Sequence, residues 1–241
     1  MLTIALAKGR TADDVMPLWT SALLPKPEGM DESRSLVFHA STVGLAGHAD
    51  GVTGKSAGDA GNADGHSGFG ESEDEAFRFL LAKPADVPTY VSFGVADIGI
   101  VGKDVVLESG REVYELLDLK KAECRLCVAG RPEHRGKPAH RVATKYPRLA
   151  DQYFRSRGEA VEIIPLGGSI ELAAVIGLAD RIFDLVQTGS TLKANGLVIF
   201  DEVMDVSARL VANRSSYRTK RRLIDEISAR LGESITAQAG V

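Results

Sequence analysis

The chain has 241 residues, of which 44% are hydrophobic and 26% charged, as is typical of a globular protein with one large or two moderate domains. Its net charge of -4 gives no reason to expect nucleic-acid binding. No apolar run approaches the length of a membrane span, and the N-terminal residues lack the pattern of a signal peptide. We therefore expect a cytoplasmic protein without a membrane or nucleic-acid partner.

The first half of the chain predicts three strands separated by helices. The predicted strands are Leu2–Ala7, Phe77–Ala82 and Asp97–Val101. The predicted helices are Ala12–Ser21, a segment that starts near Pro84, and a short helix from Lys103. Proline fits a helix start because its missing N–H has no intrahelical partner there.

The alternation of predicted strands and helices continues in the second half. Its predicted strands are Cys124–Ala129, Arg141–Thr144, Val161–Ile164 and Ile182–Val186, and its predicted helices are Pro147–Arg157 and Ile170–Leu178. Alternating strands and helices predict an α/β protein with mostly parallel sheets. Ligands of such sheets bind beyond the carboxyl ends of the strands.

One segment, residues 39–74, interrupts this rhythm. Nine of the 25 glycines lie between Gly44 and Gly70, and no hydrophobic period is visible. Such a composition buries too little apolar surface to offset the entropy of ordering, so we expect a mobile surface insertion. Its histidines, His39, His48 and His66, are expected to be solvated rather than metal-binding.

The only two cysteines, Cys124 and Cys127, have the C-x-x-C spacing of redox and metal sites. They lie within a predicted strand, where residues three apart point to opposite faces. No second Cys/His pair completes a zinc site. The sequence therefore favours reduced, packed thiols.

The run from Asp184 to Gly196 is the strongest candidate for a ligand site. Its strand ends in Thr188-Gly189-Ser190-Thr191, after which a helix begins. Hydroxyls and backbone N–H groups at such a turn suit a phosphate, and Asp184 is placed to accept hydrogen bonds from ribose hydroxyls. The residues alone leave two alternatives open: a seat for a ribose 5-phosphate, or an ordinary turn with a threonine cap.

Further candidates are basic side chains and a second glycine turn. Taken singly, each cation is equally typical of a protein surface, and the turn is equally typical of helix capping. No nucleophile–base pair or P-loop motif is present, so the inventory suits group transfer with a pyrophosphate leaving group. The cations are Lys8, Arg10, Arg34 and Lys83, and the turn is Gly167-Gly168-Ser169-Ile170-Glu171.

Several blocks together resemble the ATP phosphoribosyltransferase family, which catalyses the first step of histidine biosynthesis. In order they cover most of the chain outside the insertion and the C-terminal helix. They are Leu6–Arg10, Lys83–Tyr90, Ala96–Asp104, Arg141–Pro147, Gly168–Glu171, Gly177–Asp180 and Asp184–Gly196. Two departures are Ala7, where the family usually has proline, and Lys83, where arginine is common and would grip phosphate with two N–H groups.

The resemblance implies two α/β lobes with a cleft, similar to periplasmic binding proteins. We expect the first lobe to span 1–122, completed by 210–241, and the second lobe to span 123–209. The implied reaction joins N1 of ATP to C1 of phosphoribosyl pyrophosphate and releases pyrophosphate. A non-catalytic two-lobe binding protein for a phosphorylated small molecule is the alternative.

The resemblance also implies roles for individual residues. Lys8, Arg34 and Lys83 are expected to be catalytic, facing the pyrophosphate. Magnesium is expected to arrive on the substrate phosphates, with no dedicated protein metal site. The expected substrate-binding residues are Arg10, Gly168, Ser169, Glu171, Asp184, Thr188, Gly189, Ser190 and Thr191.

The length of the chain resembles the short form of the family, which works with a separate regulatory subunit similar to histidyl-tRNA synthetase. The implied assembly is a homodimer within a larger hetero-oligomer. The segment Arg214–Arg230, with Ile224, Ile227 and Leu231 at helical spacing, is expected to form a helix that docks another subunit.

Overall fold

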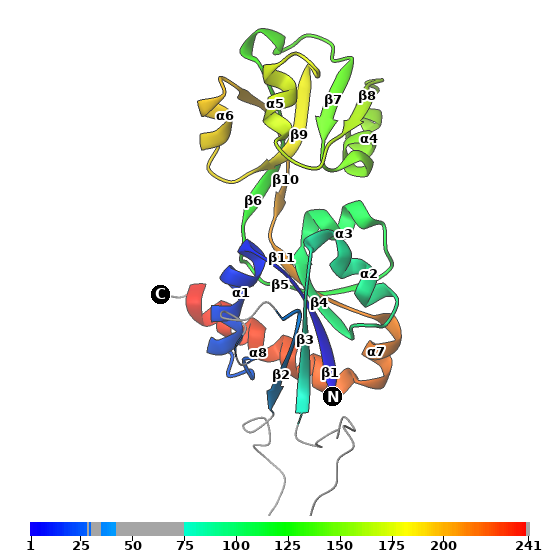
Figure 1. Cartoon of the computed structure of the whole chain (residues 1–241), viewed down its shortest axis with the longest axis vertical. Helices are drawn as coiled ribbons and strands as arrows, with labels where there is room; N and C mark the ends of the chain where they lie inside the picture. Colours follow the sequence, from blue (N-terminus) through cyan, green and yellow to red (C-terminus); the bar gives the residue numbers. More distant parts are fainter. Residues whose placement is uncertain (28, 30–34, 42–74, 240–241) are drawn as a thin grey trace, which may run out of the picture.

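The computed structural model describes residues 1–27, 29, 35–41 and 75–239. Two α/β lobes are stacked along the long axis of the molecule and are joined by two extended segments (Figure 1). The first lobe is built on a six-stranded sheet, and the second lobe on a five-stranded sheet. The predicted α/β class and two-lobe architecture are confirmed.

The sheet of the first lobe has the strand order β2-β3-β1-β4-β11-β5. Strand β1 runs parallel to both β3 and β4, and β3 pairs with β1 so that Ala7 lies opposite Ala82. The other three pairings are antiparallel. The strands are β1 (Leu2–Ala7), β2 (Val37–Ser41), β3 (Glu75–Ala82), β4 (Ile98–Gly102), β5 (Tyr114–Asp118) and β11 (Ala208–Ala212).

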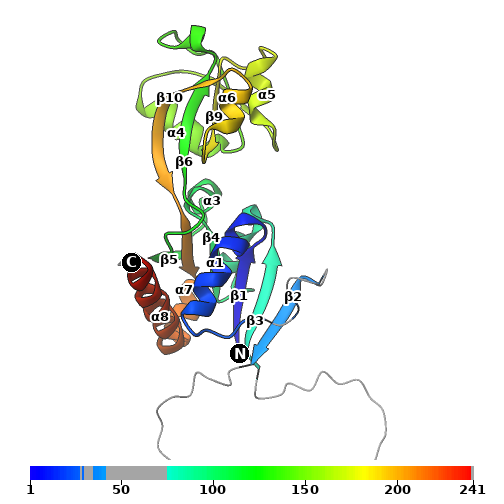
Figure 2. The same ribbon diagram turned by 90° about the vertical axis from the view of Figure 1, so that its left-hand side faces the viewer.

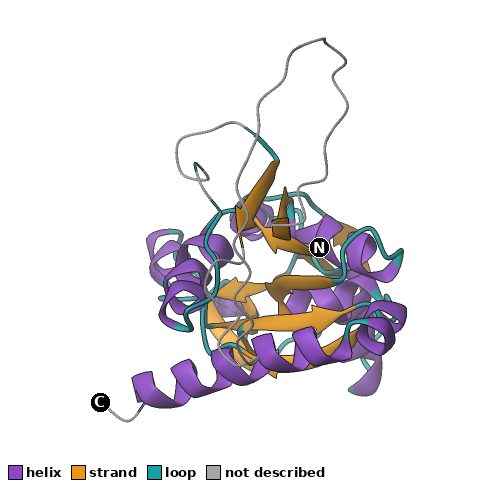
Figure 3. Ribbon diagram, turned by 90° about the horizontal axis from the view of Figure 1, so that it is seen from below, coloured by secondary structure: helices purple, strands orange, loops and turns teal. Residues whose placement is uncertain are grey.

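Helices cover both faces of this sheet (Figures 2 and 3). On one face, Ile4 and Phe79 pack with Trp19 of α1 and Ile227 of α8. On the other face, alternate strand residues pack with α2 and α3, as the two-residue period of a strand requires. The helices are α1 (Arg10–Ser21), η1 (Pro84–Asp86), α2 (Val87–Ser92), α3 (Lys103–Ser109), α7 (Arg214–Thr219) and α8 (Arg221–Ala239).

The sheet of the second lobe has the order β10-β6-β9-β7-β8. Strand β7 is parallel to β8 and β9, whereas β6 is antiparallel to β9 and β10. The strands are β6 (Cys124–Gly130), β7 (Arg141–Thr144), β8 (Glu162–Pro165), β9 (Arg181–Val186) and β10 (Val198–Val206). The helices are η2 (Pro132–His134), α4 (Pro147–Ser156), α5 (Ile170–Val175) and α6 (Ser190–Ala194).

The chain passes between the sheets twice, from β5 to β6 and from β10 to β11. The first passage has two non-glycine residues at positive φ, Lys120 at 51° and Ala122 at 52°. At the second passage, Ser207 donates a 2.7 Å hydrogen bond to Asp118. Strand β11 starts at Ala208 in the sheet of the first lobe, so we propose that the second lobe comprises 123–207, two residues shorter than the expected 123–209, and that the remaining residues form the first lobe.

The prediction of mostly parallel sheets was wrong, because each sheet contains only two parallel pairings. Sequence analysis did not identify the antiparallel strands β2, β5, β10 and β11. Strand β2 includes His39, so the predicted insertion begins after this strand rather than at residue 39. The rest of that insertion, with His48 and His66, lies outside the described residues.

Two other expectations concern packing. Ile224, Ile227 and Leu231 are helical as predicted, but they are buried against the sheet of their own lobe, so this stripe is not free to dock another subunit. Both cysteines are buried free thiols and belong to separate clusters on opposite faces of the sheet, as expected. No described helix is both long and apolar enough to cross a membrane.

Candidate active site

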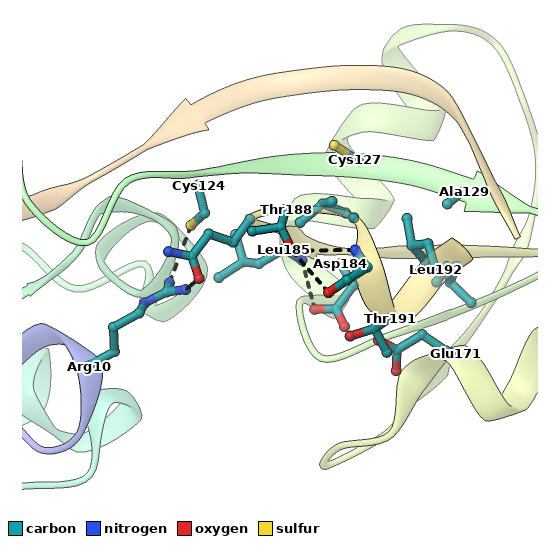
Figure 4. Close-up of a pocket in the computed structure, with 15 residues that line it drawn as sticks. Arg10, Cys124, Cys127, Ala129, Glu171, Asp184, Leu185, Thr188, Thr191 and Leu192 are labelled. Atoms are coloured by element: carbon teal, nitrogen blue, oxygen red, sulfur yellow. Dashed lines mark hydrogen bonds between the residues drawn. The ribbon is translucent and has the colours of Figure 1, made fainter. Parts of the chain in front are cut away.

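A cavity of about 260 Å³ lies between the lobes, at the carboxyl end of β9. Most of its wall comes from the second lobe, and Arg10 from the first lobe closes one side (Figure 4). The carboxyl end of a strand between lobes is the usual ligand position in α/β proteins. Of the predicted site residues, it brings together Arg10, Glu171, Asp184, Thr188, Gly189, Ser190 and Thr191.

The turn after β9 is shaped by Gly189, which has a φ of 76° and precedes the first residue of α6. Glycine adopts this left-handed conformation without the strain that a Cβ introduces. The hydroxyls of Thr188 and Ser190 are 3.0 Å apart, and the Ser190 N–H donates to the Thr188 hydroxyl at 3.3 Å. The turn therefore presents clustered hydroxyls and N–H groups to the cavity.

Asp184 is the titratable group at the base of the turn. Burial raises the pKa of its carboxyl group to about 6, although a hydrogen bond from the Leu185 N–H opposes the shift. The neighbouring carboxylate of Glu171 adds to the increase. At neutral pH, Asp184 is therefore a desolvated carboxylate, which makes it a strong acceptor for hydroxyl donors in the cavity.

Arg10 connects the two lobes. It is the first residue of α1, and its guanidinium donates to Gln187 Oε1 at 2.9 Å and to Cys124 Sγ at 3.6 Å. Figure 4 shows it reaching toward the turn from the side opposite Thr191 and Glu171. Arg10 thus places a fixed positive charge beside the turn.

Lys8 and Lys83 lie together at the edge of the first lobe, outside the lining of the cavity. Each follows the last residue of a parallel strand, and the Lys8 N–H donates to the Ala82 carbonyl at 2.9 Å. Both side chains are exposed. The carboxyl ends of β1 and β3 are directed toward the second lobe, so the two cations lie on its side of the sheet (Figure 2).

The remaining predicted residues fall into two groups. Arg34 lies outside the described residues. Gly168 and Ser169 precede α5 but do not line the cavity, and Ser169 has a φ of 50° without a capping hydrogen bond from its side chain. Of the second glycine turn, only Glu171 reaches the cavity.

Several cavity residues were not among the predicted site residues, and Gln187 and Cys124 are the two that hydrogen-bond to Arg10. Gln187 lies inside the Asp184–Thr191 run, so its place in that motif was a usable signal. Cys124 reaches the cavity from the passage between the lobes, and no local pattern in the sequence indicates that position. Within the described ranges, no three His, Cys, Asp or Glu side chains are grouped closely enough to hold a metal ion.

Comparison with known proteins identifies the family. The model of the HisG family, described as ATP phosphoribosyltransferase, matches residues 83–233. A curated ATP phosphoribosyltransferase from Geobacillus sp. (strain WCH70) is 48% identical over 98% of this chain and 99% of its own length. One from Bacillus subtilis (strain 168) is 45% identical over 96% of this chain and 94% of its own length.

Solved structures agree with this assignment. The ATP phosphoribosyl transferase (HisG:HisZ) complex from Thermotoga maritima contains a chain with a TM-score of 0.73 and 31% identity, covering 98% of this chain and 100% of that chain. The periplasmic aliphatic sulphonate binding protein SsuA from Escherichia coli, at 12% identity, shares the fold with a TM-score of 0.54 over 99% of this chain and 70% of that chain. The predicted likeness to periplasmic binding proteins is thus confirmed, and the chain belongs to the ATP phosphoribosyltransferase family.

Proposed function

We propose that the cavity between the lobes is the site at which the chain transfers the phosphoribosyl group of phosphoribosyl pyrophosphate to N1 of ATP, the first step of histidine biosynthesis. The observation that carries this assignment is the meeting of Asp184, the Thr188–Thr191 turn and the cation of Arg10 in one cavity. A ribose 5-phosphate needs these three features: acceptors for its hydroxyls, donors for its phosphate and a positive field.

The 5-phosphate binds at the Thr188–Thr191 turn. The Thr188 and Ser190 hydroxyls, already 3.0 Å apart, and the N–H groups that follow Gly189 donate to its oxygens. The Asp184 carboxylate accepts hydrogen bonds from the two ribose hydroxyls. This arrangement fixes C1 of the ribose between the lobes.

The pyrophosphate faces the first lobe, where Lys8, Lys83 and Arg10 concentrate positive charge at the ends of β1, β3 and the start of α1. As the C1–oxygen bond breaks, the ring becomes cation-like and negative charge collects on the leaving pyrophosphate. Cations placed in advance stabilise that charge without reorganising during the reaction. Arg34 completes this set in our proposal, and Gly168 and Ser169 belong to the binding surface next to Glu171.

Magnesium would arrive on the phosphates of the substrate. It is a hard cation that is usually bound through substrate phosphates and a few carboxylates. Glu171 and Asp184 are the carboxylates that line the cavity, and a pair of this kind suits a substrate-borne ion better than a resident one. Its chemistry is to neutralise the departing pyrophosphate.

We further propose a cytoplasmic hetero-oligomer. A chain 31% identical to this one over nearly its whole length occurs in a HisG:HisZ complex, which supports a regulatory partner of the same kind. Within that assembly we propose a homodimer of this chain.

The test is to incubate the chain with ATP, phosphoribosyl pyrophosphate and magnesium, with and without the regulatory subunit, and to measure phosphoribosyl-ATP by chromatography. We expect product in at least one mixture, with pyrophosphate released in equal amount. Tight binding of phosphoribosyl pyrophosphate without product in either mixture would favour the alternative, a two-lobe binding protein.

A further inference from the structure

Helix α3 of the first lobe contacts the start of α4 in the second lobe. Asp104 and Glu108 are four residues apart on α3 and therefore share one face of that helix. Both contact the segment Tyr146–Leu149, where α4 begins. This contact is separate from the hydrogen bonds that Arg10 donates to Gln187 and Cys124.

Glu108 caps α4 across the lobes. Its Oε1 accepts the Arg148 N–H and its Oε2 accepts the Leu149 N–H, each at 3.0 Å. The first N–H groups of a helix lack intrahelical acceptors, and a carboxylate there also interacts favourably with the helix dipole. Tyr146, at the N-cap position of α4, makes no capping hydrogen bond from its side chain, so the carboxylate from the other lobe fills that role.

Asp104 makes the second contact and lies closer to the cavity. Asp104, in α3, is 4% exposed and Tyr146, at the N-cap position of α4, is 5% exposed, and the two helices pack against each other. Burial, and after it the nearby carboxylate of Asp104, raises the pKa of the Tyr146 hydroxyl. Tyr146 also lies within electrostatic range of Asp184 and Cys124, which line the cavity. The Asp104–Tyr146 pair therefore joins the lobes directly beside the proposed ribose site.

We propose that Asp104 and Glu108 are positioning residues that fix the orientation of the second lobe over the first during phosphoribosyl transfer. The inference rests on the proposed function, because phosphoribosyl pyrophosphate then spans both lobes. Its ribose phosphate is held by the turn of the second lobe and its pyrophosphate by cations of the first. A misplacement of about 1 Å between such groups costs roughly 100-fold in rate.

Two variants test the orientation itself. Glu108→Gln keeps the size of the side chain but loses the charge and the second acceptor oxygen, and Tyr146→Phe removes only the hydroxyl. The matched control is Asp180→Asn. Asp180 Oδ2 also accepts two backbone N–H groups, from His140 at 2.8 Å and Arg141 at 2.9 Å, but all three residues belong to the second lobe.

The first measurement needs no substrate. Spin labels are attached at Asp86→Cys and Lys193→Cys, which are exposed positions on different lobes. Pulsed electron paramagnetic resonance then measures the distance between the lobes. We expect a broader or shifted distance distribution in Glu108→Gln and Tyr146→Phe and an unchanged one in Asp180→Asn. Unchanged distributions in both α3–α4 variants overturn the inference, whatever the substrate is.

The second measurement compares two ligands. Ribose 5-phosphate lacks the pyrophosphate that the first-lobe cations are proposed to bind, so its affinity should stay within about twofold in all variants. The KM for phosphoribosyl pyrophosphate should instead rise about tenfold in the two α3–α4 variants. Equal weakening of both ligands points to a damaged fold and contradicts a positioning role. A wild-type chain that binds neither ligand contradicts the proposed function, while the distance measurement still decides the orientation.

Discussion

At the residue scale, Asp184 affects both the proposed ligand binding and the stability of the fold. Burial raises the pKa of its carboxyl group to about 6, and the proposed function needs this group ionised to accept hydrogen bonds from ribose hydroxyls. Charging it in the folded protein therefore opposes stability at neutral pH. In the proposed site, the ionised side chain therefore favours ligand binding but lowers the free energy of unfolding. This combination is typical of functional sites whose residues have shifted pKa values.

This conflict predicts that Asp184→Asn is more stable than the wild type at pH 8. The group has a pKa of about 6 when folded and 3.8 in the reference state, so the wild type loses stability as pH rises through this window. The gain in the variant is on the order of 1–2 kcal/mol after allowance for solvent screening, or roughly 3–6 °C in Tm. Thermal melts should show the gain at pH 8 and lose it near pH 4, and an equal gain at both pH values would contradict the assigned cause.

Gly189 is the second residue with a defined physical requirement. Its φ is 76°, and an added Cβ would have 3.8 Å to the nearest atom of Val186, so there is space for a methyl group but the backbone conformation disfavours it. We expect Gly189→Ala to cost roughly 1–2 kcal/mol in chemical denaturation. The matched control is Gly168→Ala, where φ is not positive and no atom lies within 4 Å, and which should cost much less. Equal costs would show that the conformation of Gly189 is not the reason for the glycine.

At the scale of elements, the sequence predicted the strands that carry the site and missed most of the antiparallel ones. Strands such as β1 and β4 are continuous apolar runs because they are buried on both faces. Strand β10 has acidic residues, mostly half-buried side chains and two irregularities in its pairing with β6. Its sequence therefore shows neither a continuous apolar run nor a regular alternation of apolar and polar residues. Its place is determined by its long-range pairing with β6.

Only part of the candidate site could be predicted from the sequence. The Asp184–Thr191 turn could be found because one local motif contains nearly all of its chemistry. The separation of Lys8 and Lys83 from the cavity, and the contacts of Asp104 and Glu108, depend on how the lobes are oriented. Contacts between elements distant in sequence have no local pattern, so they became visible only in the structure.

A partly buried ionic contact links the terminal helices to the sheet of the first lobe. Asp97 is 7% exposed and accepts hydrogen bonds from Lys220 at 2.7 Å and from the Thr3 N–H at 2.8 Å. Burial alone would raise the pKa of Asp97, but these hydrogen bonds outweigh it and lower the pKa. Through Asp97, the junction between α7 and α8 is thus connected to the start of β1.

We expect Asp97→Asn to lose about 1.5–3 kcal/mol of unfolding free energy at pH 7. Because the folded pKa is below 3.8, the stabilisation is present above that value and is lost as pH falls through the folded pKa. Denaturant titrations should therefore show a smaller difference at pH 3 than at pH 7. Asp225→Asn is the control, since Asp225 is exposed and pairs only with Tyr217 and Arg221 of the same helices. A loss that does not depend on pH would contradict an ionic role for Asp97.

At the scale of the whole molecule, the long insertion connects two adjacent strands. Strands β2 and β3 pair antiparallel, with Ser41 opposite Glu75. A short connection is sufficient between antiparallel neighbours, so the fold does not need a long one.

Deleting residues 44–70 should therefore leave the fold intact, with 42–43 and 71–74 as the remaining loop. Shortening a loop changes its closure entropy by less than about 2 kcal/mol, and in the favourable direction. The Tm in a calorimetric melt should be equal to or slightly above that of the wild type. A Tm several degrees lower would show that the segment packs on the rest of the chain.

At this scale we propose that the two lobes bind different parts of one substrate. In the proposed function, the second lobe binds the ribose 5-phosphate through Asp184 and the Thr188–Thr191 turn, and cations of the first lobe bind the pyrophosphate. On this proposal, the second lobe mainly determines the affinity for the ribose phosphate and the first lobe the reaction rate, and the α3–α4 contact aligns the two.

The most direct test is a calorimetric titration of phosphoribosyl pyrophosphate into the wild type and Asp184→Ala, with a thermal melt of each. We predict that the variant binds at least about tenfold more weakly while its Tm is equal or higher, because the carboxylate is needed for the ribose and not for folding. Unchanged affinity in a folded variant would contradict the placement of the ribose at Asp184, and with it the division of the substrate between the lobes.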